Sequence, residues 1–140
     1  MDIRGRVTAE ARTWVGTPYH HRASIKGAGV DCAMIMIEVY SSVGLVEKFD
    51  PGEYVHDWML HREAEKYLEW VERHSRRTNT PMPGDIAVWQ FGRTFSHGAI
   101  VMEWPLVVHA HRPSRMVCYG DGSQADLADR PVRFYSVVDK

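Results

Sequence analysis

Cys32 is the residue of this sequence whose surroundings most suggest chemistry. It follows Asp31 and opens a long apolar run, CAMIMIEVYSS, which stops before Gly44. The β-branched residues of the run also fit a strand, but its length, its Asp start and its Gly end favour a buried helix. Cys32 would then lie in the first turn of that helix.

A thiol in the first turn of a helix faces unpaired backbone amides and the positive end of the helix dipole. Such a thiol has a lowered pKa, and the same amides can stabilise an oxyanion formed when the sulfur attacks a carbonyl. The carboxylate of Asp31 opposes part of this effect if it lies close to the sulfur. A cationic histidine must then supply the balance.

Eight histidines are available as the general base for this thiol. His97 begins the stretch HGAIVM, and His109 lies in LVVHAH after the connection EWPL. Antiparallel pairing through this connection brings both side chains to one face of a sheet. Cys32, His97 and His109 would then be nucleophile, base and orienting residue. His111, two residues further on the same face, competes for the third role.

The same residues also have less reactive interpretations. A free cysteine in an apolar run is most often inert core, and a histidine on a strand is usually structural. Cysteine and histidine are also metal ligands, but the sequence has no CxxC pair and no HExxH motif. We therefore predict no metal and no organic cofactor. Cys118, in a predicted strand with no histidine at useful spacing, is interpreted as core.

The elements that must position these residues change from helices to strands along the chain. Apolar residues at helical spacing from Val7 to Val15 predict an N-terminal helix that Gly16 ends. Residues 19–30, which include His20 and His21, and residues 46–57 read as loops. The stretch DWMLHREAEKYLEWVERH between them and the break TNTPMPGD predicts an amphipathic helix.

After this break the apolar period becomes two. Five short strands are predicted, with the sequences IAVWQF, SHGAIVME, LVVHAH, RMVCY and VRFYSVV. Helices followed by an antiparallel sheet indicate an α+β architecture. The cluster Arg73, Arg76 and Arg77 is interpreted as the solvated end of the amphipathic helix.

Composition limits the function classes. The 140 residues, of which 44% are hydrophobic, fit one domain over residues 1–140 with a real core. A net charge of −1 without a basic, aromatic stripe argues against nucleic-acid binding. Two cysteines are too few for a disulfide framework, so we expect free thiols. We expect neither a membrane span nor a signal peptide, because no apolar run is long enough and the N-terminus is charged.

Four segments, in order, resemble the NlpC/P60 peptidases. VGTPYHHRASIKGAGVDCAMIMIEVY resembles their nucleophile segment, PMPGDIAVW their Pro-Gly-Asp strand start, and SHGAIVM and VVHA their two histidine strands. The matches run from about Arg12 to Ala110. The resemblance implies a papain-like fold, with the nucleophile helix packed on an antiparallel sheet. It also implies a cysteine peptidase of bacterial peptidoglycan stem peptides, which commonly cuts between D-glutamate and a diamino acid.

The resemblance also implies roles for individual residues. Cys32 matches the nucleophile, His97 the base and His109 the third polar residue, and we expect Cys32 and His97 to rest largely as thiolate and imidazolium. Tyr19 matches a tyrosine near the nucleophile that donates to the oxyanion or binds substrate. Asp31 matches an aspartate that can meet a free amino terminus of the stem peptide.

A narrower resemblance concerns DPGEYVHDWMLHREAEKYLEWV, which is similar to the Trp-x-Leu-His helix of tail-associated NlpC/P60 proteins of phages, prophages and gene transfer agents. It implies a protein made in the host cytoplasm and carried on a virion tail tip, with tail-tip or hub proteins as partners. Ala33 and Met34 stand where the family has Ser-Gly, so the bond cut stays open. A catalytically relic tail-tip protein, an amidase or acyltransferase, and a zinc-binding module remain alternatives.

Overall fold

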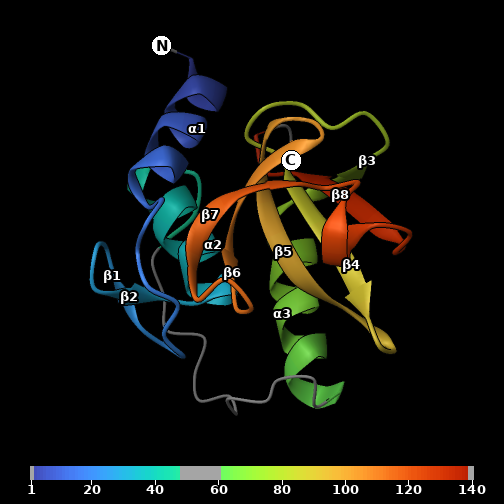
Figure 1. The fold of residues 1–140 in the computed structure, drawn as a ribbon. Coiled ribbons are helices and arrows are strands. Elements are labelled where there is room, and N and C mark those ends of the chain that lie inside the picture. The colour runs from blue at the N-terminus through green and yellow to red at the C-terminus, as the bar shows by residue number, and fades with distance from the viewer. Residues whose placement is uncertain (1, 48–60, 139–140) are drawn as a thin grey trace.

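The computed structural model describes residues 2–47 and 61–138, with the backbone alone for residues 61–67. The elements follow the predicted order of helices and then strands (Figure 1): α1 Ile3–Thr13, β1 Ser24–Ile25, β2 Gly29–Val30, α2 Cys32–Ser42, α3 His61–His74, β3 Arg76–Thr78, β4 Ile86–Phe91, β5 Thr94–Glu103, β6 Leu106–His111, β7 Met116–Asp121, the short 3₁₀ helix η1 Ala125–Leu127, and β8 Val132–Ser136. No helix within the described ranges is long and apolar enough to cross a membrane.

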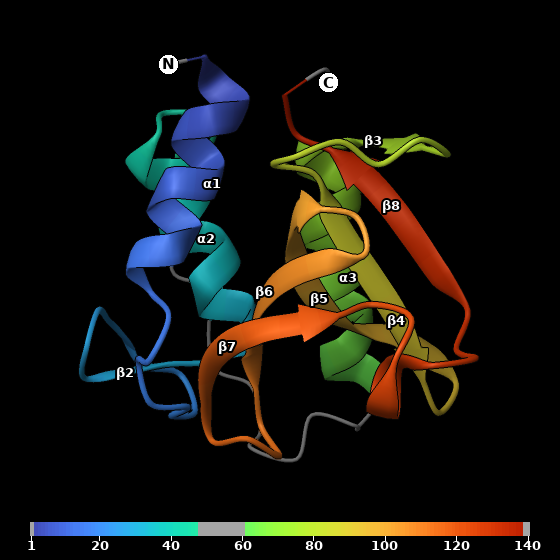
Figure 2. The same cartoon turned by 45° about the horizontal axis from the view of Figure 1, so that its top comes forward.

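The main sheet has six strands in the order β3-β8-β4-β5-β6-β7, and every neighbouring pair is antiparallel. The predicted connection EWPL joins β5 to β6 as a hairpin, with Ile100 opposite Val108. The helices α1 and α2 lie side by side near β6 and β7, while α3 runs behind β4 and β5 (Figures 1 and 2). The predicted α+β layout, with helices packed on an antiparallel sheet, is therefore confirmed.

Both faces of the central strands are buried, which explains why these strands are almost continuously apolar. All three helices pack against one face, where they meet Ile86, Val88, Ile100, Met102, Val108 and Ala110. A smaller core on the other face contains Ala87, Trp89, Ala99, Val101, Val107 and Leu127. The alternation between the two clusters is the period of two that predicted these strands.

Asp31 begins the buried helix as predicted. Its Oδ1 accepts a hydrogen bond from the amide of Met34 at 2.9 Å, so it caps α2 and leaves Cys32 in the first turn. Every residue from Ile35 to Tyr40 is buried. Gly44 follows the helix with a φ of +80°, a conformation that favours glycine. The interpretation of this run as a helix is confirmed.

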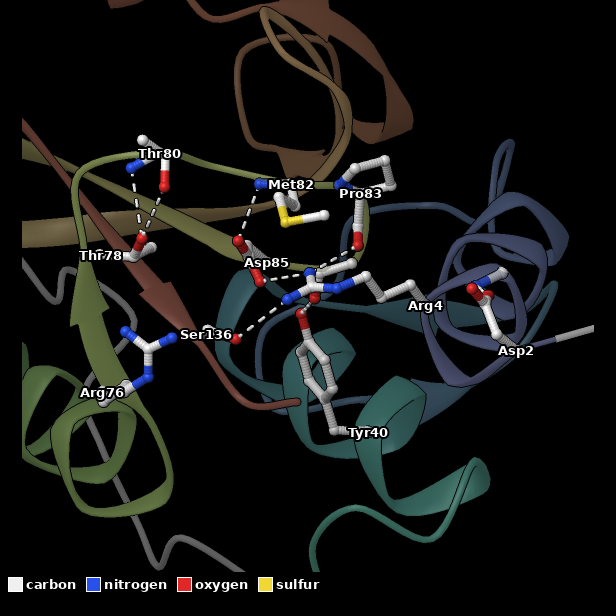
Figure 3. A network of polar contacts seen from close by, with 12 residues as sticks. Asp2, Arg4, Tyr40, Arg76, Thr78, Thr80, Met82, Pro83, Asp85 and Ser136 are labelled. Carbon is white, nitrogen blue, oxygen red and sulfur yellow. Dashed lines mark hydrogen bonds and ion pairs between the residues drawn. The ribbon is translucent and has the colours of Figure 1, made fainter. Parts of the chain in front are cut away.

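A buried polar network ties the start of β4 to α1 and α2 (Figure 3). Nη1 of Arg4 donates to Oδ1 of Asp85 at 2.8 Å and to the carbonyl of Pro83 at 2.9 Å. The hydroxyl of Tyr40 on α2 donates to the carbonyl of Gly84 at 2.7 Å. Asp85 is 1% exposed, so this ion pair is nearly removed from solvent. The PMPGD segment thereby fixes the helix that carries Cys32 against the sheet.

Two local predictions need correction, and two others concern residues outside the described ranges. Arg76 and Arg77 do not end the amphipathic helix but lie in β3, where they pair with Ser136 and Tyr135 of β8. Their side chains are exposed, as is common for charged residues on an edge strand. The predicted loop at 19–30 contains the small hairpin β1–β2. The start of the amphipathic helix and most of the loop at 46–57 lie outside the described residues.

Candidate active site

A cavity of about 180 Å³ lies where the start of α2 meets the sheet. The residues that line it come from the helix, the strands and the loops around them: Tyr19, Cys32, Phe91, Ser96, His97, Ala110, His111, Arg112, Pro113 and Asp126. The fold thus brings the predicted nucleophile and the predicted base to one cavity. This placement depends on the packing of α2 against β5 and β6.

Cys32 lies at the inner wall of this cavity and is 4% exposed. The backbone amides of Cys32 and Ala33 and the hydroxyl of Tyr19 hydrogen-bond to the thiol, and each of them favours the thiolate. The backbone of Tyr19 is fixed by a hydrogen bond, which its amide donates to the carbonyl of Arg115 at 2.9 Å. The helix start therefore presents the predicted donors to the sulfur.

These donors do not decide the protonation of the thiol. Burial, and next the negative charge of Asp31, raise the pKa of Cys32 well above its ordinary value. Desolvation disfavours the charged form of a group, and here it outweighs the helix amides. The expected lowering of the thiol pKa is therefore wrong for the protein without substrate, although the opposing effect of Asp31 has the predicted direction.

His97 and His109 form the central contact of the site. Nε2 of His97 and Nδ1 of His109 are 2.8 Å apart. The two rings meet edge to face, with their centroids 5.0 Å apart. The two residues lie on the adjacent strands β5 and β6. His109 is 3% exposed. When Nε2 of His97 carries the proton of this hydrogen bond, Nδ1 is the nitrogen of the His97 ring that can accept a proton.

Both histidines are neutral at neutral pH. Burial, followed by the neighbouring histidines, lowers the pKa of His97 to about 3, and burial together with His111 lowers the pKa of His109 to about 4. With a protonated Cys32, the expected thiolate–imidazolium pair is not the resting state. A neutral thiol and a neutral imidazole thus line the same cavity.

The same arrangement of helices and sheet occurs in solved structures. The NlpC/p60 domain of the peptidoglycan hydrolase SagA matches with a TM-score of 0.64 at 21% identity, over 95% of this chain and 97% of that one. An NlpC/P60 protein from Bacillus cereus matches with a TM-score of 0.70 at 16% identity, over 96% of this chain and 40% of that one. This chain has the NlpC/P60 fold. No protein-family model and no curated protein matches the sequence.

Another NlpC/P60 structure shows that the fold occurs without catalysis. RipD from Mycobacterium tuberculosis, described as a non-catalytic NlpC/p60 domain protein adapted to peptidoglycan binding, matches with a TM-score of 0.64 at 12% identity. The match covers 99% of each chain. The function of this chain must therefore be argued from its own site.

His111, the competing third residue, has different partners. Its Nε2 lies 2.9 Å from Oδ2 of Asp126 and its Nδ1 lies 2.6 Å from Oγ of Ser114. The centroid of its ring lies 4.6 Å from that of His109, on which it stacks, and 6.3 Å from that of His97. The geometry thus places His109, and not His111, in hydrogen-bond contact with the predicted base.

Asp31 has a structural task in this NlpC/P60 fold. It is 2% exposed, and besides capping α2 it accepts a hydrogen bond from the amide of Arg22 at 2.7 Å. His21 lies 3.9 Å from the same carboxylate, while the exposed His20 contacts the carbonyl of His21 at 3.2 Å. The proposed meeting of Asp31 with a substrate amino terminus stays a prediction.

Sequence reasoning missed several cavity residues. The ring of Phe91 meets that of His97 edge to face, with the ring centroids 5.7 Å apart, and Asp126 contacts His111 from η1. Neither belongs to a motif, and Asp126 follows its partner by 15 positions across a hairpin. Such contacts depend on the sheet register, which spacing along the chain does not show.

Cys118 has a histidine neighbour that the sequence did not reveal. It is half-buried and free, as Cys32 is also free, so the prediction of free thiols is confirmed. Cys118 lies directly opposite His109 in the β6–β7 pairing. The interpretation of Cys118 as core without a nearby histidine is therefore wrong, because the relevant neighbour lies across the sheet.

Proposed function

We propose that the chain is an NlpC/P60 cysteine peptidase that hydrolyses peptidoglycan stem peptides. One observation carries the proposal. Cys32, at the start of a buried helix, and His97, hydrogen-bonded to His109, line the same cavity. This is the constellation of nucleophile, base and orienting residue that thiol hydrolysis requires. The NlpC/P60 fold, which the peptidoglycan hydrolase SagA shares, supports the substrate class.

The first step transfers a proton while a bond forms. Because both groups rest in the neutral state, Nδ1 of His97 takes the thiol proton as the sulfur of Cys32 attacks the scissile carbonyl. The amides of Cys32 and Ala33 and the hydroxyl of Tyr19, which already contact the thiol, stabilise the resulting oxyanion. His97 then protonates the leaving amine, and a thioester remains on Cys32.

Hydrolysis of the thioester reverses the roles. His97 takes a proton from water, the hydroxide attacks the acyl carbon, and the proton returns to the sulfur of Cys32 as the acid leaves. Throughout, Nδ1 of His109 accepts the hydrogen bond from Nε2 of His97, which keeps Nδ1 of His97 available as the base. His109 is thus a positioning residue for His97.

We propose further that the bond cut joins D-glutamate to a diamino acid and that the protein acts at a virion tail tip. The sequence resemblance over residues 50–71 supports the tail location and tail-tip or hub proteins as partners. Of these residues, 50–60 lie outside the described part of the chain. The presence of Ala33 in place of the usual serine is the reason to determine the bond directly.

A second candidate function is peptidoglycan binding without cleavage. The match to non-catalytic RipD and the raised pKa of Cys32 favour it. The shared cavity favours catalysis, because a protein that only binds peptidoglycan does not need Cys32 and His97 to line the same cavity. An amidase or acyltransferase would use the same intermediate, and its products differ when an amine acceptor is supplied.

The test is digestion of purified stem peptides by wild type, Cys32→Ala and Cys118→Ser in the presence of EDTA, with mass spectrometry of the products. We expect cleavage by wild type and Cys118→Ser and none by Cys32→Ala. Equal cleavage by Cys32→Ala would exclude Cys32 as the nucleophile. Binding of the peptides without cleavage by any form would support the binding function instead.

A further inference from the structure

A second group of reactive side chains lies beside the catalytic pair. His109 and His111 on β6 and Cys118 on β7 place one potential ligand atom each within 4.8 Å of one another. Cys118 is opposite His109 in the sheet register, and His111 is two residues further on the same face. His109 is buried, and the other two side chains are half-buried. Two imidazoles and a thiol thus lie close together in a largely buried cluster.

The imidazole of His109 packs closely against Gly120 of β7. A Cβ on Gly120 would lie only 2.7 Å from Nε2 of His109, so this edge of the ring fits only because residue 120 has no side chain. Ser114 lies between the other two groups, since its hydroxyl is 2.6 Å from Nδ1 of His111 and hydrogen-bonds to Cys118. A polar hydroxyl therefore lies between the two half-buried donors.

The donor set matches a particular class of ion. Histidine nitrogen with cysteine sulfur is typical of Zn²⁺, with bonds of about 2.0–2.3 Å, so the three ligands need to converge by roughly 1 Å. The contact of His111 Nε2 with Asp126 supplies the carboxylate partner that metal-bound histidines commonly have. The metal would then bind Nδ1 of His111 in place of the Ser114 hydroxyl, which contacts this nitrogen at 2.6 Å. Three protein ligands leave a fourth position for water.

We propose that His109, His111 and Cys118 form a Zn²⁺ site whose occupation switches off the catalytic pair. The site differs from the sequence-based prediction of no metal, because it uses Cys118 and not Cys32. Its inhibitory effect rests on the proposed function, whereas the binding of the ion does not.

The switch follows from the direction of one hydrogen bond. In the working enzyme Nε2–H of His97 donates to Nδ1 of His109, and the proton of His109 is on Nε2. A metal at Nε2 of His109 moves that proton to Nδ1, so the 2.8 Å bond now runs from His109 to His97. Neutral His97 then carries its proton on Nδ1 and cannot accept the proton of Cys32. Binding releases the thiol proton of Cys118 to solvent.

The binding test uses Co²⁺ as a spectroscopic substitute for Zn²⁺, added to Cys32→Ala protein, in which Cys118 is the remaining cysteine. We expect one Co²⁺ per chain and a thiolate-to-cobalt charge-transfer band that excess Zn²⁺ abolishes. Calorimetry should show that the double variant Cys32→Ala, Cys118→Ser binds Zn²⁺ at least tenfold more weakly than Cys32→Ala does. Absence of the band, or an unchanged Zn²⁺ affinity in the double variant, would overturn the site.

The inhibition test compares wild type with Cys118→Ser in the stem-peptide assay. We expect equal activity in EDTA, loss of wild-type activity on addition of Zn²⁺, and at least a tenfold higher Zn²⁺ requirement for inhibition of Cys118→Ser. Equal inhibition of both forms would mean that zinc acts directly at Cys32 and His97, and the switch would be refuted. No cleavage by wild type in EDTA would refute the proposed function and leave the cobalt result standing.

Discussion

Proton positions decide the chemistry at the scale of single residues. Burial holds Cys32 as a thiol and His97 as a neutral imidazole. In the proposed mechanism the proton therefore moves only when a carbonyl is in place to be attacked. The helix amides act on the sulfur in the expected direction, but they are weaker than desolvation. In the proposed mechanism their main contribution comes later, when negative charge develops on the substrate oxygen.

This resting state predicts slow alkylation of Cys32 at neutral pH. In Cys118→Ser protein, where Cys32 is the remaining cysteine, we expect the rate of reaction with iodoacetamide to rise steadily into the alkaline range. The cause is the raised pKa of the thiol, since only the thiolate reacts. A fast reaction with a plateau between about pH 6 and pH 8 would show a preformed ion pair instead.

At the scale of elements, the position of Cys32 depends on how α1 and α2 are fastened to the sheet. The Arg4–Asp85 pair joins α1 to the start of β4, and Tyr40 joins α2 to the same segment. Removing one partner of a buried pair leaves the other charge without compensation in a place that solvent does not reach.

We therefore expect Arg4→Met to lower the free energy of unfolding by about 3 kcal/mol, measured by urea denaturation. The matched control is Arg73→Ala, which breaks the exposed pair with Glu69, whose side chains are both 68% exposed. That change should cost less than about 0.5 kcal/mol. Similar losses for both variants would refute a special role of the Asp85 network.

The elements also show what a sequence can predict. The bounds of β4 and β6 agree with their apolar stretches, and Asp31 identifies the start of α2, because each signal lies within the element itself. The strands of β1 and β2 are two residues long, too short for a period to appear. The His97–His109 contact was predictable through a short hairpin, but the pairing of His109 with Cys118 required the register of a further strand.

At the scale of the whole molecule, burial of neutral histidines links stability to pH. The unfolded chain binds protons at an ordinary histidine pKa of about 6.5, whereas His97 and His109 fold with pKa values of about 3 and 4. Between these limits the unfolded state binds more protons. The contribution of these two histidines to stability is therefore fully present above about pH 6.5 and is lost as the pH falls toward 4.

When the pH falls from neutral to about 5, we expect the free energy of unfolding to decrease by about 1 to 2 kcal/mol for each of these histidines. Urea denaturation in EDTA over this range measures the slope. A variant with His109→Gln should show a smaller slope than wild type, since one of the two groups no longer titrates. An equal slope in both proteins would assign the effect to other groups.

The burial of Cys32 has a consequence for the lifetime of the protein. Peroxide oxidises cysteine through its thiolate, so a thiol that is 4% exposed and kept protonated is a poor target. Cys118, which is half-buried, is the more accessible sulfur. In an oxidising environment Cys118 should therefore be oxidised before Cys32, the proposed nucleophile.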